Sequence, residues 1–511
     1  MEIVKSENAP IIIASIAAVA GLATTLSLWR KSGRDRKYLP MPPTLPVLGN
    51  IHLINGRDPI TCFAYWGQKL GHIFRFRMGA NDWIIINDAA VGHELCSRRG
   101  AVYNSRSTEN SFLKILTKDF HDMASTPYGE DWRKRRRIFM DAMGLRTVPV
   151  YVNYINAEAQ SLIKNLAAAN AAPVDPTQCL MLFTFNVILK IMADERLKDP
   201  NEPWLQEGID SQAKLFGYLG PSGNPVTLFP ILRYLPQSWV GPNNQEVRDF
   251  KKAYDARLQG ILDRVSTWLA NGEDIKCFCK DLLEKQKEGA IDSVEIIELL
   301  NNTLSAGLET SSTTLAWLIA ELANHPYIQE DLHEEVGKVM KADDSPSYNN
   351  AFNIPLLQAC IRETMHLHPA GPLGLPHATS KDDIYNGYFI PKESTVILNL
   401  YTMNRDPVKY PEPNNFNPYR YLDDVQQLSS ALANGKIEDR DHTSFGFGRR
   451  ICAGIHIAET ELLSAAAALV WAFDIMRAGP ELIDTVHYKL GLTMSPLPFE
   501  VQFIKRNDAL A

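Results

Sequence analysis

One short stretch decides the fold: Phe445-Gly446-Phe447-Gly448-Arg449-Arg450-Ile451-Cys452-Ala453-Gly454. It holds a single cysteine between glycines, and an alanine-rich segment with helical spacing follows. Gly448 can adopt a positive φ, which a tight turn around a bulky ligand requires. Cys452 is expected near the N-terminus of the next helix, where free amides and two arginines favour the thiolate. Gly454 has no side chain, so a flat ring can pack against it.

Cys452 has two interpretations. An isolated cysteine is usually a small buried hydrophobic residue, whereas a thiolate in such a turn can serve as axial ligand of a haem iron. The spacing Phe-x-x-Gly-x-Arg-x-Cys-x-Gly favours the second, because it resembles the haem-thiolate loop of the cytochrome P-450 superfamily. The resemblance implies a mainly α fold with a minor β region, and haem b (iron protoporphyrin IX) as cofactor. It also implies that Cys452 binds the iron and that the other fixed positions contact the haem: Phe445, Gly448, Arg450 and Gly454.

Length and composition set the broad class. The chain has 511 residues, of which 45% are hydrophobic and 22% charged; these values indicate neither a disordered protein nor a polytopic membrane protein. A net charge of −7 gives no reason to expect nucleic acid as a partner. The seven cysteines are odd in number and scattered, which fits a reducing compartment better than a disulfide framework.

Residues 11–29 carry no charge and are rich in apolar side chains. As a helix they would span about 28 Å, close to the roughly 30 Å of a bilayer core. A basic flank at residues 30–37 places the remaining chain in the cytosol by the positive-inside rule. A cleaved signal peptide is the alternative, but the apolar run is too long and its basic flank is on the wrong side. We expect a single membrane anchor within residues 1–37, a proline-rich hinge at 40–50, and one catalytic domain over 38–511. Resemblance to microsomal family members implies the endoplasmic reticulum membrane.

A few strands are predicted before and after a long helical region. A β-hairpin is expected from residues 72–77 and 83–87, which flank a Gly-Ala-Asn-Asp turn. Helical spacing dominates from Asp88 onward. Near the carboxy end we expect a strand over 396–399 and a second hairpin over 492–503.

Trp132 and Arg136 lie in the most basic run of the chain, four residues apart and so on one helix face. Such a run usually forms a solvated helix face. The pair also matches the family's Trp-x-x-x-Arg, which implies contact with a haem propionate, and the other cations would form a patch for an acidic electron donor. By position, His377 and Arg450 match two further propionate contacts of the family.

A long helix is predicted over residues 293–324, with Ser293 as its cap. It contains Ala306-Gly307-Leu308-Glu309-Thr310-Ser311. A glycine inside a helix costs about 1 kcal/mol against alanine, so we interpret it as leaving room for a diatomic ligand; a helix kink is the alternative. The stretch resembles the family's oxygen-side signature, which implies that Glu309 and Thr310 carry protons to bound dioxygen.

One supporting site departs from the family. Glu363 is followed by His366 where the family has Glu-x-x-Arg, while Arg420 matches the second arginine that binds this glutamate behind the cysteine loop. Histidine is shorter than arginine and offers at most two donors. Two accounts stay open: His366 bonds Glu363 as an imidazolium, or Arg420 pairs with Glu363 alone. Either should weaken the haem scaffold without changing its chemistry.

The implied activity is a monooxygenase that inserts one oxygen atom from dioxygen into a lipophilic small molecule, as in fungal secondary metabolism. No dinucleotide-binding motif is recognisable, so electrons would come from NADPH through a separate NADPH-cytochrome P-450 reductase, with cytochrome b5 as a further candidate donor. The apolar segments 103–120 and 216–239 favour a hydrophobic substrate. The rivals are a haem-thiolate isomerase or dehydratase that needs no dioxygen, a non-catalytic haem-binding protein, and a structural membrane protein without haem.

Overall fold

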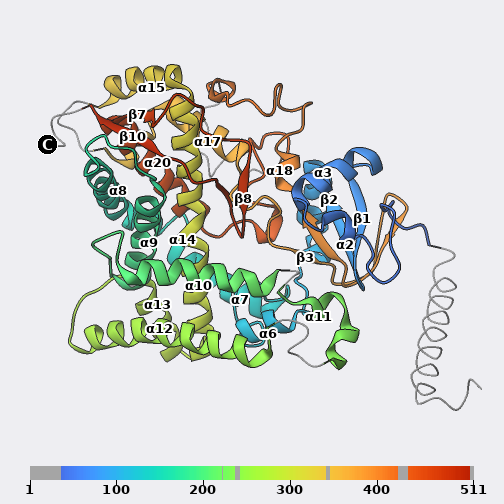
Figure 1. Cartoon of the computed structure of the whole chain (residues 1–511). Helices are drawn as coiled ribbons and strands as arrows, with labels where there is room; N and C mark the ends of the chain where they lie inside the picture. The colour runs from blue at the N-terminus through green and yellow to red at the C-terminus, as the bar shows by residue number, and fades with distance from the viewer. Residues whose placement is uncertain (1–35, 221–222, 236–241, 341–345, 424–435, 507–511) are drawn as a thin grey trace, which may run out of the picture.

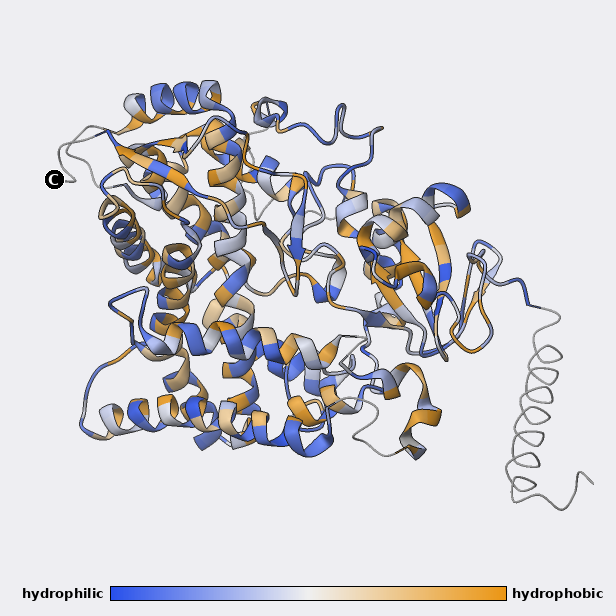
Figure 2. Ribbon diagram, viewed as in Figure 1, coloured by the Kyte–Doolittle hydropathy of each residue, from blue (hydrophilic) through white to orange (hydrophobic). Residues whose placement is uncertain are grey.

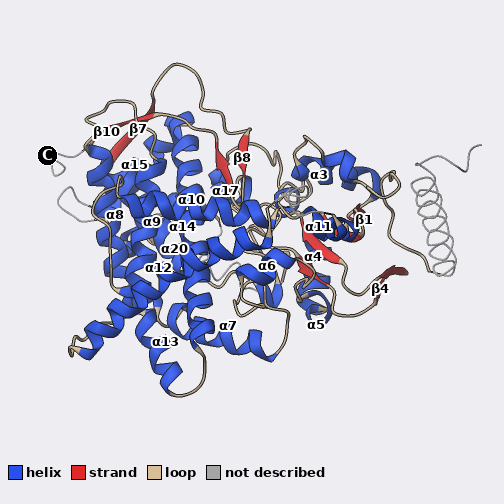
Figure 3. Ribbon diagram, turned by 60° about the horizontal axis from the view of Figure 1, so that its bottom comes forward, coloured by secondary structure: helices blue, strands red, loops and turns tan. Residues whose placement is uncertain are grey.

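The computed structural model describes residues 36–220, 223–235, 242–340, 346–423 and 436–506. The described chain forms a large helical body with a smaller β region beside it (Figure 1), and helices predominate throughout (Figure 3). This arrangement confirms the predicted mainly α fold with a minor β region. The predicted transmembrane helix lies outside the described residues.

Ten longer helices build the body: α7 (Glu130–Met143), α8 (Val152–Ala167), α9 (Thr177–Ala193), α10 (Pro203–Leu219), α12 (Asn244–Ala270), α13 (Phe278–Lys287), α14 (Ser293–Asn324), α15 (Pro326–Val339), α17 (Pro355–Leu367) and α20 (Ile455–Ala472). Most are amphipathic, as the alternating blue and orange of α12 illustrates (Figure 2). The 12-residue α3 (Pro59–Leu70) packs against β1 in the β region. The described chain also has shorter helical pieces: α2 (Ile51–Ile54), α4 (Ala89–His93), η2 (Glu94–Arg98), α5 (Gly100–Tyr103), α6 (Ser111–Leu116), η3 (Val148–Val150), α11 (Pro225–Leu228), η4 (Pro230–Tyr234), α16 (Tyr348–Ala351), α18 (Leu400–Met403), η6 (Pro418–Tyr421) and η7 (Gly448–Arg450).

Helix α14 runs through the middle of the body and packs against α9, α17 and α20 (Figure 1). Its predicted span is confirmed, but Ser293 is not its cap. The N-cap is Asp292, whose carboxylate accepts from the Glu295 amide while the Glu295 side chain accepts from the Asp292 amide. This reciprocal capping box satisfies two amides that would otherwise lack partners.

The main sheet has the order β1-β2-β6-β3. Strands β1 (Ile73–Met78) and β2 (Asn81–Ile86) form the predicted hairpin, and β6 (Thr395–Leu398) lies parallel to β2. Strand β3 (His377–Ala378) pairs antiparallel with β6 and so fixes the position of His377. The sheet thereby joins segments about 300 residues apart, as the register of Trp83 with Thr395 shows.

The described chain has three further two-stranded sheets: β4 (Asp383–Tyr385) with β5 (Tyr388–Ile390), β7 (Phe473–Arg477) with β10 (Val501–Lys505), and β8 (Tyr488–Leu490) with β9 (Met494–Pro496). The β7–β10 pair belongs to the helical body, where it packs against α8, α14 and α20 (Figure 1). The hairpin predicted over residues 492–503 is therefore wrong, because β9 and β10 pair with different partners. Pro496 and Pro498 explain the interruption, since neither has the amide hydrogen that a continuous ladder needs.

Helix α20, which follows the cysteine loop, is long and apolar enough to cross a bilayer by composition. Within the described residues it is the one helix that meets this test, and its most apolar window is 89% buried inside the protein. It therefore belongs to the core, where it packs against α8, α14 and α17.

Candidate active site

The cysteine loop, residues 445–454, contains η7 and leads directly into α20. The Cys452 amide donates to the carbonyl oxygen of Phe445 at 2.9 Å, which closes the loop. Gly448 has a φ of +58°, and a β-carbon there would lie 2.3 Å from the backbone oxygen of Cys96. The turn therefore requires glycine at this position. A β-carbon built on Gly454 meets no atom within 4 Å, so the backbone before α20 presents a flat, open face.

Desolvation by the surrounding protein raises the pKa of the Cys452 thiol, although the side chain itself is exposed. The Gly454 amide and the Arg136 guanidinium lower this pKa, as the sequence predicted, but by less than desolvation raises it. Arg449 contributes little because it turns outward and donates to the Tyr128 hydroxyl at 2.7 Å. A bound metal ion deprotonates a coordinating thiol outright. This accessible cysteine therefore suits a metal-bound thiolate better than a free one.

Arg450 points inward, unlike its neighbour. Its guanidinium donates to three backbone oxygens, those of Asn104 at 3.0 Å, Met123 at 3.2 Å and Thr126 at 2.5 Å. Its Cζ also lies 4.5 Å from the centroid of the Trp132 ring. Burial, and repulsion from other arginines, lower the pKa of Arg450 to about 8. Holding this guanidinium charged is therefore costly unless an anion lies beside it.

The other arginines belong to the same cluster. Arg106 repels both Arg450 and His377, and burial lowers the pKa of Arg106 to about 10. Burial also lowers the pKa of His377, whose Nδ1 lies 2.9 Å from the Tyr103 oxygen. Arg136 donates to the Ile451 oxygen at 2.7 Å. In the described part of the chain, these four basic side chains form no ion pair with a carboxylate.

This cation cluster, defined as the guanidinium groups of Arg106, Arg136 and Arg450 together with the His377 imidazole, fits the propionates of haem. Because burial lowers the pKa of His377, its ring adds positive charge only when an anion lies beside it. The hydrogen bonds of the cluster go to backbone oxygens. The Asp122 carboxylate lies near enough to raise the pKa of Arg106 and of Arg450, but it forms no ion pair with either in the described residues. Two further carboxylates would supply the remaining negative charge. Trp132 lies under Arg450 and supports it rather than contributing charge.

The sequence reasoning missed Arg106 because it lies in an irregular loop where no motif distinguishes it. Its neighbours Asn104, Ser105, Ser107 and Thr108 are polar, so nothing in the sequence marked this arginine as buried.

The basic run of α7 divides between two environments. Lys134 and Arg135 both pair with Glu295, at 2.7 Å and 2.9 Å, and Arg135 is buried. Arg135 therefore does not belong to the predicted solvated patch, whereas the Lys134 side chain stays partly exposed. Arg133 and Arg137 are exposed, and they leave a smaller basic surface than the sequence indicated.

Thr310 and Glu309 are neighbours on α14 but face different partners. The Thr310 hydroxyl donates to the Ala306 oxygen at 2.9 Å. One oxygen of the Glu309 carboxyl accepts from the Thr493 hydroxyl at 3.4 Å, on the turn between β8 and β9. Burial raises the pKa of Glu309, an effect that Thr493 and Lys489 oppose. No hydrogen bond joins Glu309 to the Thr310 hydroxyl within the described structure.

Gly307 does not serve the predicted purpose. A β-carbon there would lie 2.3 Å from Cγ1 of Ile188 on α9. The missing side chain therefore allows α14 to approach α9, where Thr184 donates to the Leu308 oxygen at 2.7 Å. The prediction that Gly307 leaves room for a diatomic ligand is wrong. The small accessible residue in this turn of the helix is Ala306.

Comparison with known proteins accounts for the cysteine loop, the cation cluster and the Glu309-Thr310 pair occurring in one chain. The sequence profile described as Cytochrome P-450 matches residues 39–503. The chain belongs to the cytochrome P-450 family. Family membership makes it a haem-binding oxidoreductase that incorporates molecular oxygen.

Two curated cytochrome P-450 relatives come from fungi. The cytochrome P-450 monooxygenase virE of Hypocrea virens is 29% identical over 504 residues, covering 96% of this chain and 90% of the relative. The cytochrome P-450 monooxygenase acuD of Aspergillus aculeatus is 30% identical over 468 residues, covering 91% and 87%. A solved zebra fish cytochrome P-450 with abiraterone superposes with a TM-score of 0.73 at 23% identity, covering 88% of this chain and 99% of that chain. The last likeness concerns the fold alone.

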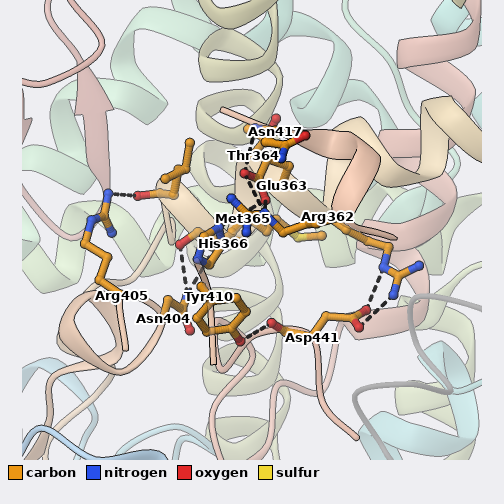
Figure 4. Close-up of polar contacts among 12 residues, drawn as sticks. Arg362, Glu363, Thr364, Met365, His366, Asn404, Arg405, Tyr410, Asn417 and Asp441 are labelled. Atoms are coloured by element: carbon orange, nitrogen blue, oxygen red, sulfur yellow. Dashed lines mark hydrogen bonds and ion pairs between the residues drawn. The ribbon is translucent and has the colours of Figure 1, made fainter. Parts of the chain in front are cut away.

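The departure from the cytochrome P-450 pattern is visible in Figure 4. His366 Nδ1 lies 3.1 Å from Oε2 of Glu363, and Arg420 Nε lies 3.2 Å from the same oxygen. Both residues therefore bind Glu363, and the account in which Arg420 pairs with it alone is wrong. The His366 ring lies 4.3 Å from the Tyr410 ring, centroid to centroid. Its Nε2 is buried and has no hydrogen-bond partner in the described residues.

Proposed function

We propose that the chain is a haem-thiolate monooxygenase that inserts one oxygen atom from dioxygen into a lipophilic small molecule and reduces the other to water. The observation that carries the proposal is the cation cluster beside an accessible cysteine. Such a cluster lacks carboxylate partners of its own in the described chain, and haem b brings both the carboxylates and the iron.

Each site residue then has a physical task. Bound haem b would supply a thiolate-ligated iron that activates dioxygen. Cys452 would hold the iron, while Phe445, Gly448 and Gly454 shape the loop against the haem face. Three members of the cation cluster, Arg136, His377 and Arg450, would anchor the propionates, and Trp132 would support Arg450.

Glu309 and Thr310 would move the protons that the reaction consumes. A carboxyl whose pKa is raised by burial is partly protonated closer to neutral pH, which suits proton transfer. The Thr310 hydroxyl is held by its hydrogen bond to the Ala306 backbone oxygen. From this position it would pass protons toward the bound dioxygen. To hydrogen-bond with the Thr310 hydroxyl, the Glu309 carboxyl would first have to break its bond with the Thr493 hydroxyl.

Electrons would come from an NADPH-cytochrome P-450 reductase, with cytochrome b5 as a further donor. The exposed arginines Arg133, Arg137 and Arg449 lie on the cysteine-loop side of the fold, where α7 and η7 meet through Tyr128. An acidic partner docked there would be steered by charge.

A single-pass anchor within residues 1–37, in the endoplasmic reticulum membrane with the catalytic domain in the cytosol, completes the proposal. Exposed apolar side chains near the start of the described chain support it. Leu45, Val47 and Leu48 precede β1, and Ile231 and Tyr234 belong to η4. The two segments meet at the turn between β1 and β2, where Gly79 donates to the Leu48 oxygen and Ala80 to the Leu228 oxygen. We call this surface the apolar rim.

The substrate is proposed to be hydrophobic, and its source fungal secondary metabolism. The two predicted specificity segments pack together: the Phe112 and Tyr218 rings lie 6.1 Å apart, centroid to centroid, in one apolar cluster. Asn224 donates to Asn110 at 2.9 Å and ties the same segments.

The test is a reduced, carbon-monoxide-bound difference spectrum, followed by turnover with NADPH and reductase. We expect the red-shifted thiolate-type band in the wild-type protein and its loss in Cys452→Ala. Product formation that needs NADPH, reductase and dioxygen would exclude an isomerase or dehydratase. Absence of any haem signal would overturn the proposal and favour a protein without haem chemistry.

A further inference from the structure

The last turn of α17 is held by side chains from outside the helix. A helix leaves its final carbonyl oxygens without intrahelical partners. Here the Ser444 hydroxyl donates to the Met365 oxygen at 2.7 Å, and Asn404 Nδ2 lies 3.2 Å from the His366 oxygen. Ser444 directly precedes the cysteine loop, so the helix end and the loop are fastened together.

Asn404 is the centre of this junction. Its side chain is fully buried, and its amide group both accepts and donates hydrogen bonds. Its Oδ1 accepts from the amide and the hydroxyl of Thr443, both at 2.8 Å, and its Nδ2 donates to the Ser444 hydroxyl at 3.0 Å. Figure 4 shows it beside the end of the helix, next to His366. One amide group thus joins α17 to the two residues before Phe445.

A second attachment lies one turn earlier on α17. The Arg362 guanidinium binds the Asp441 carboxylate through two contacts, Nε to Oδ2 at 2.6 Å and Nη2 to Oδ1 at 2.7 Å. Both side chains are buried, and the Tyr410 hydroxyl donates to the backbone oxygen of Asp441. A paired, planar contact of this kind fixes orientation as well as distance.

The junction leads directly to the cysteine. The Gly446 amide donates to the Thr443 oxygen at 2.8 Å, and the Cys452 amide donates to the Phe445 oxygen at 2.9 Å. Residues 443–446 therefore form the base of the loop. His366 contributes no side-chain bond to this base, because its Nδ1 binds Glu363 and its Nε2 makes no hydrogen bond among the described residues.

We propose that Asn404 and the Arg362–Asp441 pair are positioning residues that hold the cysteine loop in this chain, in place of the arginine that His366 replaces. The inference rests on the proposed haem-thiolate function. It explains how a buried histidine is tolerated there: the loop is fastened to α17 at two other points.

The test compares Asn404→Ala with Asn399→Ala. Asn399 is an equally buried asparagine five positions earlier, but it bonds to the Ile60 oxygen at 3.2 Å and the Thr402 amide at 3.3 Å, away from the cysteine loop. The readouts are haem content and the proportion of the thiolate-type band in the reduced carbon-monoxide spectrum. We expect Asn404→Ala to lower the ratio of the thiolate-type to the shorter-wavelength band by about tenfold, because it leaves buried donors and acceptors unpaired. Asn399→Ala should lower stability while keeping the wild-type ratio.

Ser444→Ala provides a milder second variant if Asn404→Ala does not fold. It removes one bond to α17 and should shift the same ratio in the same direction by a smaller factor. Equal band ratios in the wild type, Asn404→Ala and Ser444→Ala would overturn the inference. A wild-type protein that holds no haem would instead refute the proposed function, so the two failures are distinguishable.

Discussion

At the scale of single residues, adjacent arginines have opposite environments. Arg450 is held inward by three carbonyl oxygens, and Arg449 faces solvent. We predict that Arg450→Leu speeds loss of haem by about tenfold or more, because a charge-assisted bond to a propionate is worth about 1.5–3 kcal/mol. Arg449→Leu is the matched control and should change the rate little. Haem transfer to excess apomyoglobin measures both, and equal rates would contradict the assigned role of Arg450.

A second prediction concerns Glu461, a buried carboxyl on α20. It accepts from the Ser311 hydroxyl at 2.5 Å, and its other oxygen has no partner in the described chain. Burial raises the pKa of Glu461 to about 8, whereas an unfolded glutamic acid titrates near about 4.3. The native state thus binds this proton more tightly, so its contribution to stability is full below about pH 4 and is lost as pH rises to about 8.

Glu461→Gln should remove that loss. We expect the free energy of unfolding of the variant to exceed that of the wild type by about 1–3 kcal/mol at pH 8, and the difference to shrink toward pH 5. Urea unfolding at several pH values measures it. A difference that is independent of pH would show that the carboxyl is ionised in the native protein.

At the scale of elements, α14 packs tightly against α9 at Gly307. We predict that Gly307→Ala lowers the free energy of unfolding by about 1–3 kcal/mol, because overpacking displaces Ile188. Ile188→Ala in the same protein should recover part of this loss by making room for the new methyl group. Thermal unfolding of the two single variants and the double variant measures the coupling. Additive effects would mean that the two side chains do not meet.

Elements with strong periodic patterns were predictable. The span of α14, the β1–β2 hairpin and the turn of the cysteine loop follow from helical spacing, alternation and glycine placement. The sequence could not show which face of α14 Gly307 occupies, since that depends on Ile188, more than 100 positions earlier. Arg106 and Asn404 were missed for the same reason: their partners come from distant segments, and neither belongs to a local motif. The predicted pairing of β9 with β10 was wrong because the partner of a strand is decided by tertiary packing, which the local sequence does not show.

At the scale of the whole molecule, the apolar rim predicts membrane contact independent of the anchor. A variant that lacks residues 1–37 should still bind phospholipid vesicles, because Val47 and Ile231 are 59% and 69% exposed. Changing both to aspartate should weaken vesicle binding by about tenfold or more, given the free energy of burying such side chains. Val408→Asp is the control, since that valine is 91% exposed but lies outside the rim. Vesicle flotation measures all three, and equal binding would refute the rim as a contact surface.

The parallel pairing of β2 with β6 has a consequence for biosynthesis. Ile86 can find Leu398 only after the ribosome has added the intervening residues, which takes roughly a quarter of a minute to a minute at about 5–20 residues per second. During that interval the apolar strand β2 is paired with β1 on one side only. An unpaired strand edge of this kind favours aggregation, so we expect the yield in a foreign host to respond to translation speed and chaperone supply.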